Sequence, residues 1–267
     1  MTVLLGGARD SSVMVWRNLV TIRRNPDLLL GAVISPIVFV LVFAYVFAGS
    51  LGGQEYRHFL IAGIFVQTVA FNSAFTTLGL TNDLTKGMID RFRSLPMSRL
   101  AVILGRTCSD LAVTAVTLTI MTLTGLVVGW RIQGSLPAAV LGYLLLLFFA
   151  FAMSWIGAWI GLLCRSVEVA QSAGLLWLFP VSFVANVFVS AQTLPGPLRA
   201  FAEWNPISAV ANTTRALFGN PIQPPGIAPA TGWPAEHAAL YAVLASVAII
   251  AVFMPLALAR YRRIAAR

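Results

Sequence analysis

Charged residues are scarce in this chain of 267 residues: they make up 10% of the sequence, whereas hydrophobic residues make up 58%. Because soluble domains carry about 25% charged residues, most of this chain must face lipid or other buried helices. Lys and Arg (18) nevertheless outnumber Asp and Glu (9), which gives a formal net charge of +9. In a soluble protein this excess would suggest a nucleic-acid partner, but here the basic residues must first be placed relative to a membrane.

Other shortages argue against a catalytic or metal-binding role. The two cysteines, Cys108 and Cys164, form no motif, and both fall near expected cytoplasmic helix ends, where a disulfide is not expected. Two histidines and a few peripheral acidic residues offer no converging set of groups, so we predict no catalytic residue and no metal site. The chain also lacks a GxxxxGK sequence followed by Ser or Thr, so it has no phosphate-cradling loop of its own.

Apolar segments of sufficient length to cross a bilayer, about 20 residues each, recur along the chain. We expect six spans, at residues 28–48, 59–80, 101–128, 136–163, 169–189 and 238–259. The predicted fold class is therefore all-α and polytopic. The chain divides into a cytoplasmic N-terminus over residues 1–27, a transmembrane domain over residues 28–259 and a basic cytoplasmic tail over residues 260–267.

The basic residues predict the orientation of these spans. With both termini inside, only Arg57, Arg131, Arg199 and Arg215 fall on the outer side, and the other 14 of the 18 Lys and Arg fall inside. This bias follows the positive-inside rule. It also explains the net charge without any nucleic-acid partner, because a solvated basic face beside anionic lipid is sufficient.

The N-terminal residues 11–25 are expected to form an amphipathic helix. Arg17 and Arg24 share one face of that helix, and Trp16 and Val20 share another. Such a helix lies in the inner membrane interface. It anchors the chain, and anchoring does not exclude a second role in steering the first span.

A second amphipathic segment, residues 82–96, connects the second and third expected spans. Asn82 or Asp83 can cap the start of a helix, and Pro96 ends it. The apolar positions of this helix form one stripe, made by Leu84, Met88, Phe92 and Leu95. Because a cytoplasmic apolar stripe needs a cover, the helix either lies on the bilayer or inserts into a groove of a partner protein. The spacing alone does not decide between these two.

The last connector, residues 190–237, contains eight prolines. Its middle, residues 198–218, is amphipathic, so we expect short re-entrant or surface helices there. Asn205 is expected to cap a helix or to form a turn, with Pro206 at the first helical position. Arg215 would lie near the end of that helix, where its charge is favourable. Simple turn chemistry in an outer loop is the alternative.

Two expected spans carry a face of amides and aromatic rings. These faces hold Gln67, Thr68, Phe71, Asn72, Phe75 and Gly79 on the second span, and Gln171, Phe179, Ser182, Phe183, Asn186 and Ser190 on the fifth. Amides that face lipid are costly, so both faces should point into the helix bundle. They either line a path for a flat amphiphilic substrate or form ordinary hydrogen bonds between helices.

Several short motifs together resemble one family of membrane proteins. The motifs occupy residues 87–96 (GMIDRFRSLP), 98–99, 105–107, 110–111, 129–131, 154–157, 165–166 with Glu168, 179–180, 204–206 and 215–221. In order and spacing they resemble the permease subunits of ABC-2 type transporters, in particular the daunorubicin/doxorubicin-resistance permeases of actinobacteria. The resemblance runs from about residue 17 to residue 263, although no single motif is decisive.

This resemblance implies a specific assembly in the bacterial cytoplasmic (inner) membrane. Two six-span permease subunits, identical or different, would pair, and two copies of a separate ATPase subunit would bind ATP and Mg. A coupling helix would dock onto the ATPase through Leu84, Met88, Asp90, Arg91, Phe92, Arg93 and Leu95. A hydrophobic drug-like or lipid substrate would follow a path lined by Gln67, Phe71, Asn72, Phe75, Phe179, Phe183 and Asn186. An outer gate would contain Trp204, Asn205, Pro206 and Arg215.

Other functions have to be weighed against this exporter. A permease of the same family could carry a polysaccharide or a glycolipid. An ion-coupled secondary transporter would need an ionisable residue near the middle of the membrane, whereas Asp110 and Glu168 lie near expected cytoplasmic ends. A passive membrane anchor for a soluble complex would show no substrate-dependent ATPase stimulation.

Overall fold

The computed structural model describes residues 26–47, 53–88, 99–224, 226–228 and 230–265, and these form helices and loops without a strand. The predicted interfacial helix at residues 11–25 and most of the predicted coupling helix, including Asp90, Arg91, Phe92, Arg93 and Leu95, lie outside the described residues. The elements are α2 (Pro26–Val42), the π-helix η1 (Phe43–Phe47), α4 (Gly53–Thr85), α6 (Arg99–Val127), α7 (Leu136–Gly161), α8 (Val167–Leu176), α9 (Leu178–Phe183), the 3-10 helix η2 (Ala191–Thr193), α10 (Gly196–Glu203), α11 (Pro206–Phe218), α12 (Trp233–Glu236) and α13 (Ala238–Ala265).

Four of the described helices are long and apolar enough to cross a membrane: Gly53–Thr85, Ile103–Val127, Leu136–Gly161 and Ala238–Ile264. Two further apolar segments, Ile34–Val46 and Val167–Phe183, are shorter. All six lie where the sequence predicts spans. The chain is thus an all-helical polytopic protein, and the count of six spans stays a prediction.

The fifth expected span is broken into two helices. Helix α8 ends at Leu176, and α9 begins at Leu178 and ends at Phe183. Pro180 has no backbone N–H to donate to the carbonyl of Leu176, four residues earlier, so a continuous α-helix is interrupted here. The segment after Phe183 follows an irregular path, and helical periodicity no longer decides which way its side chains point.

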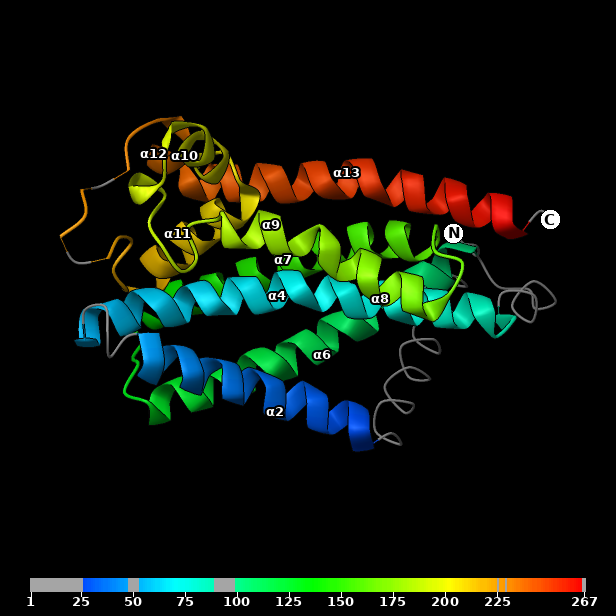
Figure 1. The fold of residues 1–267 in the computed structure, drawn as a ribbon, viewed down its shortest axis with the longest axis horizontal. Coiled ribbons are helices and arrows are strands. Elements are labelled where there is room, and N and C mark those ends of the chain that lie inside the picture. The colour runs from blue at the N-terminus through cyan, green and yellow to red at the C-terminus, as the bar shows by residue number, and fades with distance from the viewer. Residues whose placement is uncertain (1–25, 48–52, 89–98, 225, 229, 266–267) are drawn as a thin grey trace.

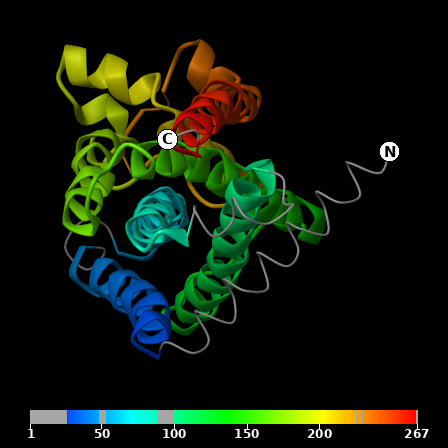
Figure 2. The same cartoon turned by 90° about the vertical axis from the view of Figure 1, so that its right-hand side faces the viewer.

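Helix α4 forms the centre of the bundle. Figure 1 shows it running along the long axis of the molecule, and the end-on view of Figure 2 places α2, α6, α7 and α8 around it, with α13 packed against α7 farther out. Every residue from Phe59 to Gln67 is buried. A helix that is buried on all sides over several turns must be enclosed by other helices, which explains why this segment is apolar all round from Phe59 to Val66.

Close contact between α4 and α7 depends on two glycines spaced four residues apart. The hydroxyl of Thr77 donates to the carbonyl of Gly157 (3.0 Å), and that of Thr81 donates to the carbonyl of Gly161 (2.9 Å). A Cβ atom at Gly157 would lie 2.2 Å from the carbonyl oxygen of Ser73. Small residues at this spacing let two membrane helices approach until their backbones touch.

The expected start of a helix at Asn82 or Asp83 is wrong, because α4 continues through both residues to Thr85. The amide of Lys86 still donates to the carbonyl of Asn82 (3.1 Å), so the helical hydrogen bonds end only there. Gly87 then adopts a positive φ of 65°, the conformation in which a glycine commonly ends a helix. Leu84 accordingly belongs to α4, where it packs against the cluster formed by Leu80, Ile103, Trp155, Ala158, Leu162, Ala257 and Tyr261.

Helix α11 begins as the sequence predicts. The side-chain oxygen of Asn205 accepts a hydrogen bond from the amide of Ile207 (2.9 Å), and Pro206 occupies the first helical position. Gly219, in the left-handed conformation, ends the helix, with Arg215 in its last turn. Helix α11 packs against α4, α7 and α13 at the end of the bundle that also holds α10 and α12 (Figure 1).

Candidate functional site

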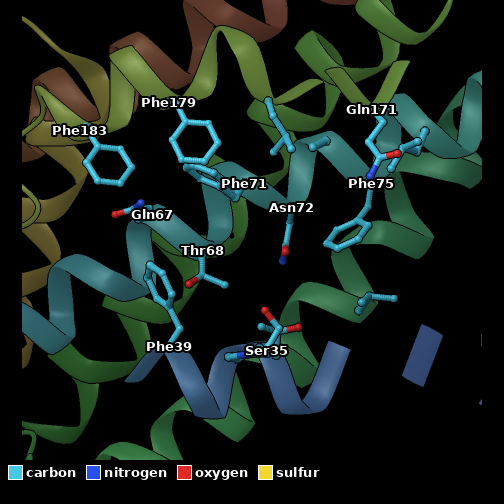
Figure 3. Close-up of a pocket in the computed structure, with 16 residues that line it drawn as sticks. Ser35, Phe39, Gln67, Thr68, Phe71, Asn72, Phe75, Gln171, Phe179 and Phe183 are labelled. Carbon is cyan, nitrogen blue, oxygen red and sulfur yellow. The ribbon is translucent and has the colours of Figure 1, made fainter. Parts of the chain in front are cut away.

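A cavity of about 360 Å³ lies between α2, α4, α6, α8 and α9 (Figure 3). We call it the phenylalanine cavity, because five of its residues are Phe39, Phe71, Phe75, Phe179 and Phe183. Its other lining residues are Ser35, Pro36, Gln67, Thr68, Asn72, Ala74, Leu78, Val113, Thr117, Gln171 and Leu175. The cavity therefore brings together six of the seven residues that the sequence assigns to a substrate path, from segments about 100 residues apart.

The phenylalanine rings form a connected array. Phe71 meets Phe179 edge to face, with ring centroids 5.3 Å apart, and Phe179 stacks on Phe183 at 5.6 Å. The array continues from Phe183 to Phe188 (5.4 Å) and from there to Phe43 (4.7 Å). Flat aromatic ligands can pack against such rings, since offset-stacked and edge-to-face contacts add to the energy of apolar burial.

Amides of α4 provide the polar part of the cavity. Figure 3 shows Gln67, Thr68 and Asn72 pointing into it. The Asn72 side chain donates to the hydroxyl of Thr114 (3.1 Å), so it is held by α6. Gln67 is only 3% exposed, and its Oε1 atom has no hydrogen-bond partner among the described residues. A buried acceptor without a partner costs about 1–3 kcal/mol.

Asn186, the seventh predicted path residue, does not line the cavity. Its side-chain amide donates to Asn212 of α11 (2.7 Å), and its backbone amide donates to the hydroxyl of Ser208 (2.8 Å). The prediction extended the helical periodicity of the fifth span to residue 189, but the helix ends at Phe183. Asn186 therefore points toward α11 and joins the surroundings of Arg215.

Arg215 is fully buried in contact with backbone carbonyls. Its Nε atom donates to the carbonyl of Phe59 (2.9 Å), Nη1 to that of Asn186 (2.7 Å) and Nη2 to that of Val187 (2.8 Å). The guanidinium also lies over the Phe59 ring, 3.6 Å from its centroid. Arg215 thus joins α11, α4 and the segment after α9. The sequence predicts its place near the end of a helix but gives no sign of this burial.

The other residues predicted to form an outer gate lie near α11 in different environments. Asn205 is buried, and its side-chain nitrogen donates to the carbonyl of Val181 (2.6 Å), which ties the start of α11 to α9. Trp204 is exposed and stacks on Trp233, with ring centroids 6.3 Å apart. The Tyr241 hydroxyl donates to the Trp204 carbonyl (2.5 Å), so α13 supports this aromatic group.

A polar cluster that sequence analysis missed lies next to the cavity. Asp110 Oδ2 accepts hydrogen bonds from the Thr76 hydroxyl (2.7 Å) and from Arg106 Nε (3.1 Å). Arg106 Nη2 donates in turn to the carbonyl of Phe75 (3.1 Å). The spacing of four residues between Arg106 and Asp110 is a signal that could have identified the pair, because such residues share one helix face.

An all-helical membrane protein with a ligand-sized cavity between its helices has the architecture of a transporter permease. The chain belongs to the ABC-2 type transporter family, whose model matches residues 10–218. It is 31% identical over 271 residues to the daunorubicin resistance ABC transporter permease protein DrrB1 of Streptomyces coeruleorubidus, covering 98% of this chain and 92% of that protein. It is 24% identical over 206 residues to the probable doxorubicin resistance ABC transporter permease protein DrrC of Mycobacterium tuberculosis, covering 74% of this chain and 73% of the relative.

Proposed function

We propose that this chain is the permease subunit of an ATP-driven exporter that moves hydrophobic, drug-like molecules out of a bacterial cell. The observation that carries the proposal is the phenylalanine cavity, in which five aromatic rings and six uncharged polar side chains surround a space of ligand size. The names of the relatives, which refer to resistance to aromatic drugs, support the same substrate class.

Energy for transport comes, in this proposal, from a separate ATPase subunit present in two copies, which binds ATP and Mg. The coupling segment at residues 82–96 docks onto it, with Leu84 and Met88 at the described edge of that segment. Because α4 is continuous from Gly53 to Thr85, a movement of this segment is transmitted along the helix that lines the cavity. Alternating access then results from rocking of α4 and its neighbours against a second permease subunit.

Release on the outer side involves α10, α11 and α12. Both chain termini are cytoplasmic in this proposal, so these helices lie at the outer face of the inner membrane. Trp204, Asn205, Pro206 and Arg215 would hold the exit closed. Arg215 contacts the Asn186 and Val187 carbonyls, which follow the cavity-lining helix α9, so opening of the exit and emptying of the cavity are mechanically connected.

Replacement of both Phe179 and Phe183 by alanine is expected to lower efflux of aromatic substrates about tenfold. The two rings stack on each other, line the cavity and are about half exposed (48% and 51%), so their loss removes apolar contact with the substrate, not core packing. The measurement is ATP-dependent efflux of a fluorescent aromatic compound from cells that also express the ATPase subunit.

Leu176→Ala is the matched control, because Leu176 ends the preceding helix α8, is 77% exposed and does not line the cavity. It should transport normally at equal expression. Unchanged efflux by the double phenylalanine variant at equal amounts in the membrane would contradict the assignment of this cavity to the substrate.

A further inference from the structure

A groove of about 350 Å³ lies between helices α6 and α7, and we call it the α6–α7 groove. Its lining residues are Ala115, Leu118, Thr119, Thr122, Leu123, Tyr143 and Leu147. It is separate from the phenylalanine cavity, because the two share no lining residue. Thr119 and Leu123 are exposed, so the groove opens to the surroundings of the bundle. Both helices are long and apolar enough to cross a membrane, and those surroundings are therefore lipid.

The few polar groups of the groove already have hydrogen-bond partners. The hydroxyls of Thr122 and Tyr143 form a hydrogen bond with each other (2.6 Å), and the Thr119 hydroxyl donates to the carbonyl of Ala115 (2.9 Å). The other lining side chains are apolar. A hydrocarbon chain can therefore enter the groove without leaving a hydrogen-bonding group unpaired.

The groove and the last turn of α6 together match one leaflet of a membrane in length. The lining begins at Ala115, and α6 ends at Val127, about 18 Å farther along the helix axis. Half of a hydrocarbon core about 30 Å thick is about 15 Å. Because the orientation proposed above places this end of α6 outside, the groove faces the outer leaflet.

Arg131 lies at the end of this groove. The groove-lining residues of α6 fall within about 140° of arc, and Leu126 lies inside the same arc. The Nη1 atom of Arg131 donates to the carbonyl of Leu126 (2.5 Å) and to that of Trp130 (2.8 Å), which holds the guanidinium beside this face. The three N–H groups on Nε and Nη2 have no acceptor among the described residues, so they can bind a ligand.

Arg131 differs from the other three arginines that the proposed orientation places outside. Arg215 is fully buried, Arg199 is paired with a carboxylate, and Arg57 is only partly exposed. Arg131 alone among them is exposed and forms no ion pair within the described part of the chain. A phosphate is a suitable partner, since its oxygens match the planar set of guanidinium N–H groups.

We propose that the α6–α7 groove and Arg131 together bind an anionic phospholipid. An acyl chain lies in the groove, and the phosphate accepts hydrogen bonds from the Arg131 guanidinium. An anionic headgroup is favoured over a zwitterionic one, because the ammonium of the latter offsets the phosphate charge next to Arg131. This inference goes beyond the proposed function and takes from it only the orientation of the spans.

Lipid binding to the purified, delipidated full-length chain in detergent tests the role of Arg131. Phosphatidylglycerol and phosphatidylcholine with identical acyl chains are added at equal concentrations, and the bound lipids are counted by native mass spectrometry. We expect phosphatidylglycerol to bind about fivefold more tightly, which is the contribution of one basic residue near a lipid surface. Arg131→Gln should abolish this preference, whereas Arg131→Lys, which keeps the charge, should retain most of it.

A second variant tests the groove independently of the charge. Thr119→Phe places a ring in the groove and should weaken the binding of both lipids about tenfold, since it displaces about two methylene groups of the chain. Val116→Phe is the matched control, because Val116 is 58% exposed on α6 and does not line the groove. Arg199→Gln is the control for the loss of an outer charge. Both controls should bind lipid as the wild type does, and all variants are compared as single eluting species.

The outcomes separate the two parts of the site from each other and from the proposed function. Equal binding of the two lipids by the wild type, or an unchanged preference in Arg131→Gln, would overturn the role given to Arg131. Wild-type binding by Thr119→Phe would overturn the assignment of the groove to an acyl chain. None of these results bears on export, because the assay contains no ATPase and every variant leaves the phenylalanine cavity intact.

Discussion

Gly157→Ala is expected to reduce the yield of folded protein sharply and to destabilise what remains by about 2–3 kcal/mol, although it adds a single methyl group. That methyl would lie 2.2 Å from the Ser73 carbonyl oxygen, a backbone atom that cannot rotate away. Helices α4 and α7 would have to separate, which would also lengthen the hydrogen bond from Thr77 to the Gly157 carbonyl. The gain of about 1 kcal/mol from the higher helix propensity of alanine is too small to compensate.

The same substitution at three other glycines provides a graded control, measured by unfolding in mixed detergent micelles. Gly161→Ala should follow closely, since its Cβ would lie 2.6 Å from the Thr77 carbonyl oxygen, and Gly174→Ala should be mild, with the nearest atom, Ala74 Cβ, at 3.3 Å. Gly196→Ala should be neutral, because no atom lies within 4 Å of its Cβ. Equal stability of the Gly157 and Gly196 variants would contradict backbone contact between α4 and α7.

Arg215→Met is expected to cost about 3 kcal/mol and to abolish transport, because it leaves the carbonyls of Asn186 and Val187 buried without their donor. Removal of a buried charge recovers desolvation energy, but methionine supplies none of the three hydrogen bonds that the guanidinium donates to backbone carbonyls. Arg215→Lys should be intermediate, since an ammonium group cannot reproduce the planar fork. Thermal unfolding and efflux are the two measurements.

Two further variants test whether the geometry of Arg215, not merely its charge, is responsible. Gly63→Ala places a methyl 2.5 Å from the Val187 carbonyl oxygen and 2.6 Å from Arg215 Nη2, so it should reproduce the defect without altering any charge. Arg199→Met removes a partly exposed ion pair with Glu203 and should cost less than about 1 kcal/mol. Wild-type efflux by Arg215→Met would exclude this residue from the transport cycle.

The sequence predicts much of the helical framework, because its strongest signal is the length of apolar segments and lipid leaves few alternatives to a helix. Each of the six apolar helical segments coincides with an expected span. Helix ends were predicted less well. Nothing near Asn82 marks a continuation of α4, and the cap chemistry that the sequence suggests there is not used, since the helix continues to Thr85.

The candidate site was predicted where periodicity holds and missed where it fails. Gln67, Phe71 and Phe75 share one face of a regular helix, so their convergence follows from their spacing. Asn186 lies beyond the break that Pro180 introduces, and its direction depends on contacts with α11. The surroundings of Arg215 depend on the tertiary structure. Its three carbonyl partners come from two segments that are distant in sequence, and no local sequence pattern specifies such contacts.

Reconstitution in sealed liposomes tests most directly the claim that this permease depends on a separate ATPase for energy. Vesicles that contain the purified chain alone should not accumulate a fluorescent aromatic substrate, whether or not a proton or sodium gradient is imposed. Vesicles that contain the chain with its ATPase subunit should accumulate it when ATP and Mg are supplied. Accumulation driven by an ion gradient in the absence of the ATPase would contradict the account.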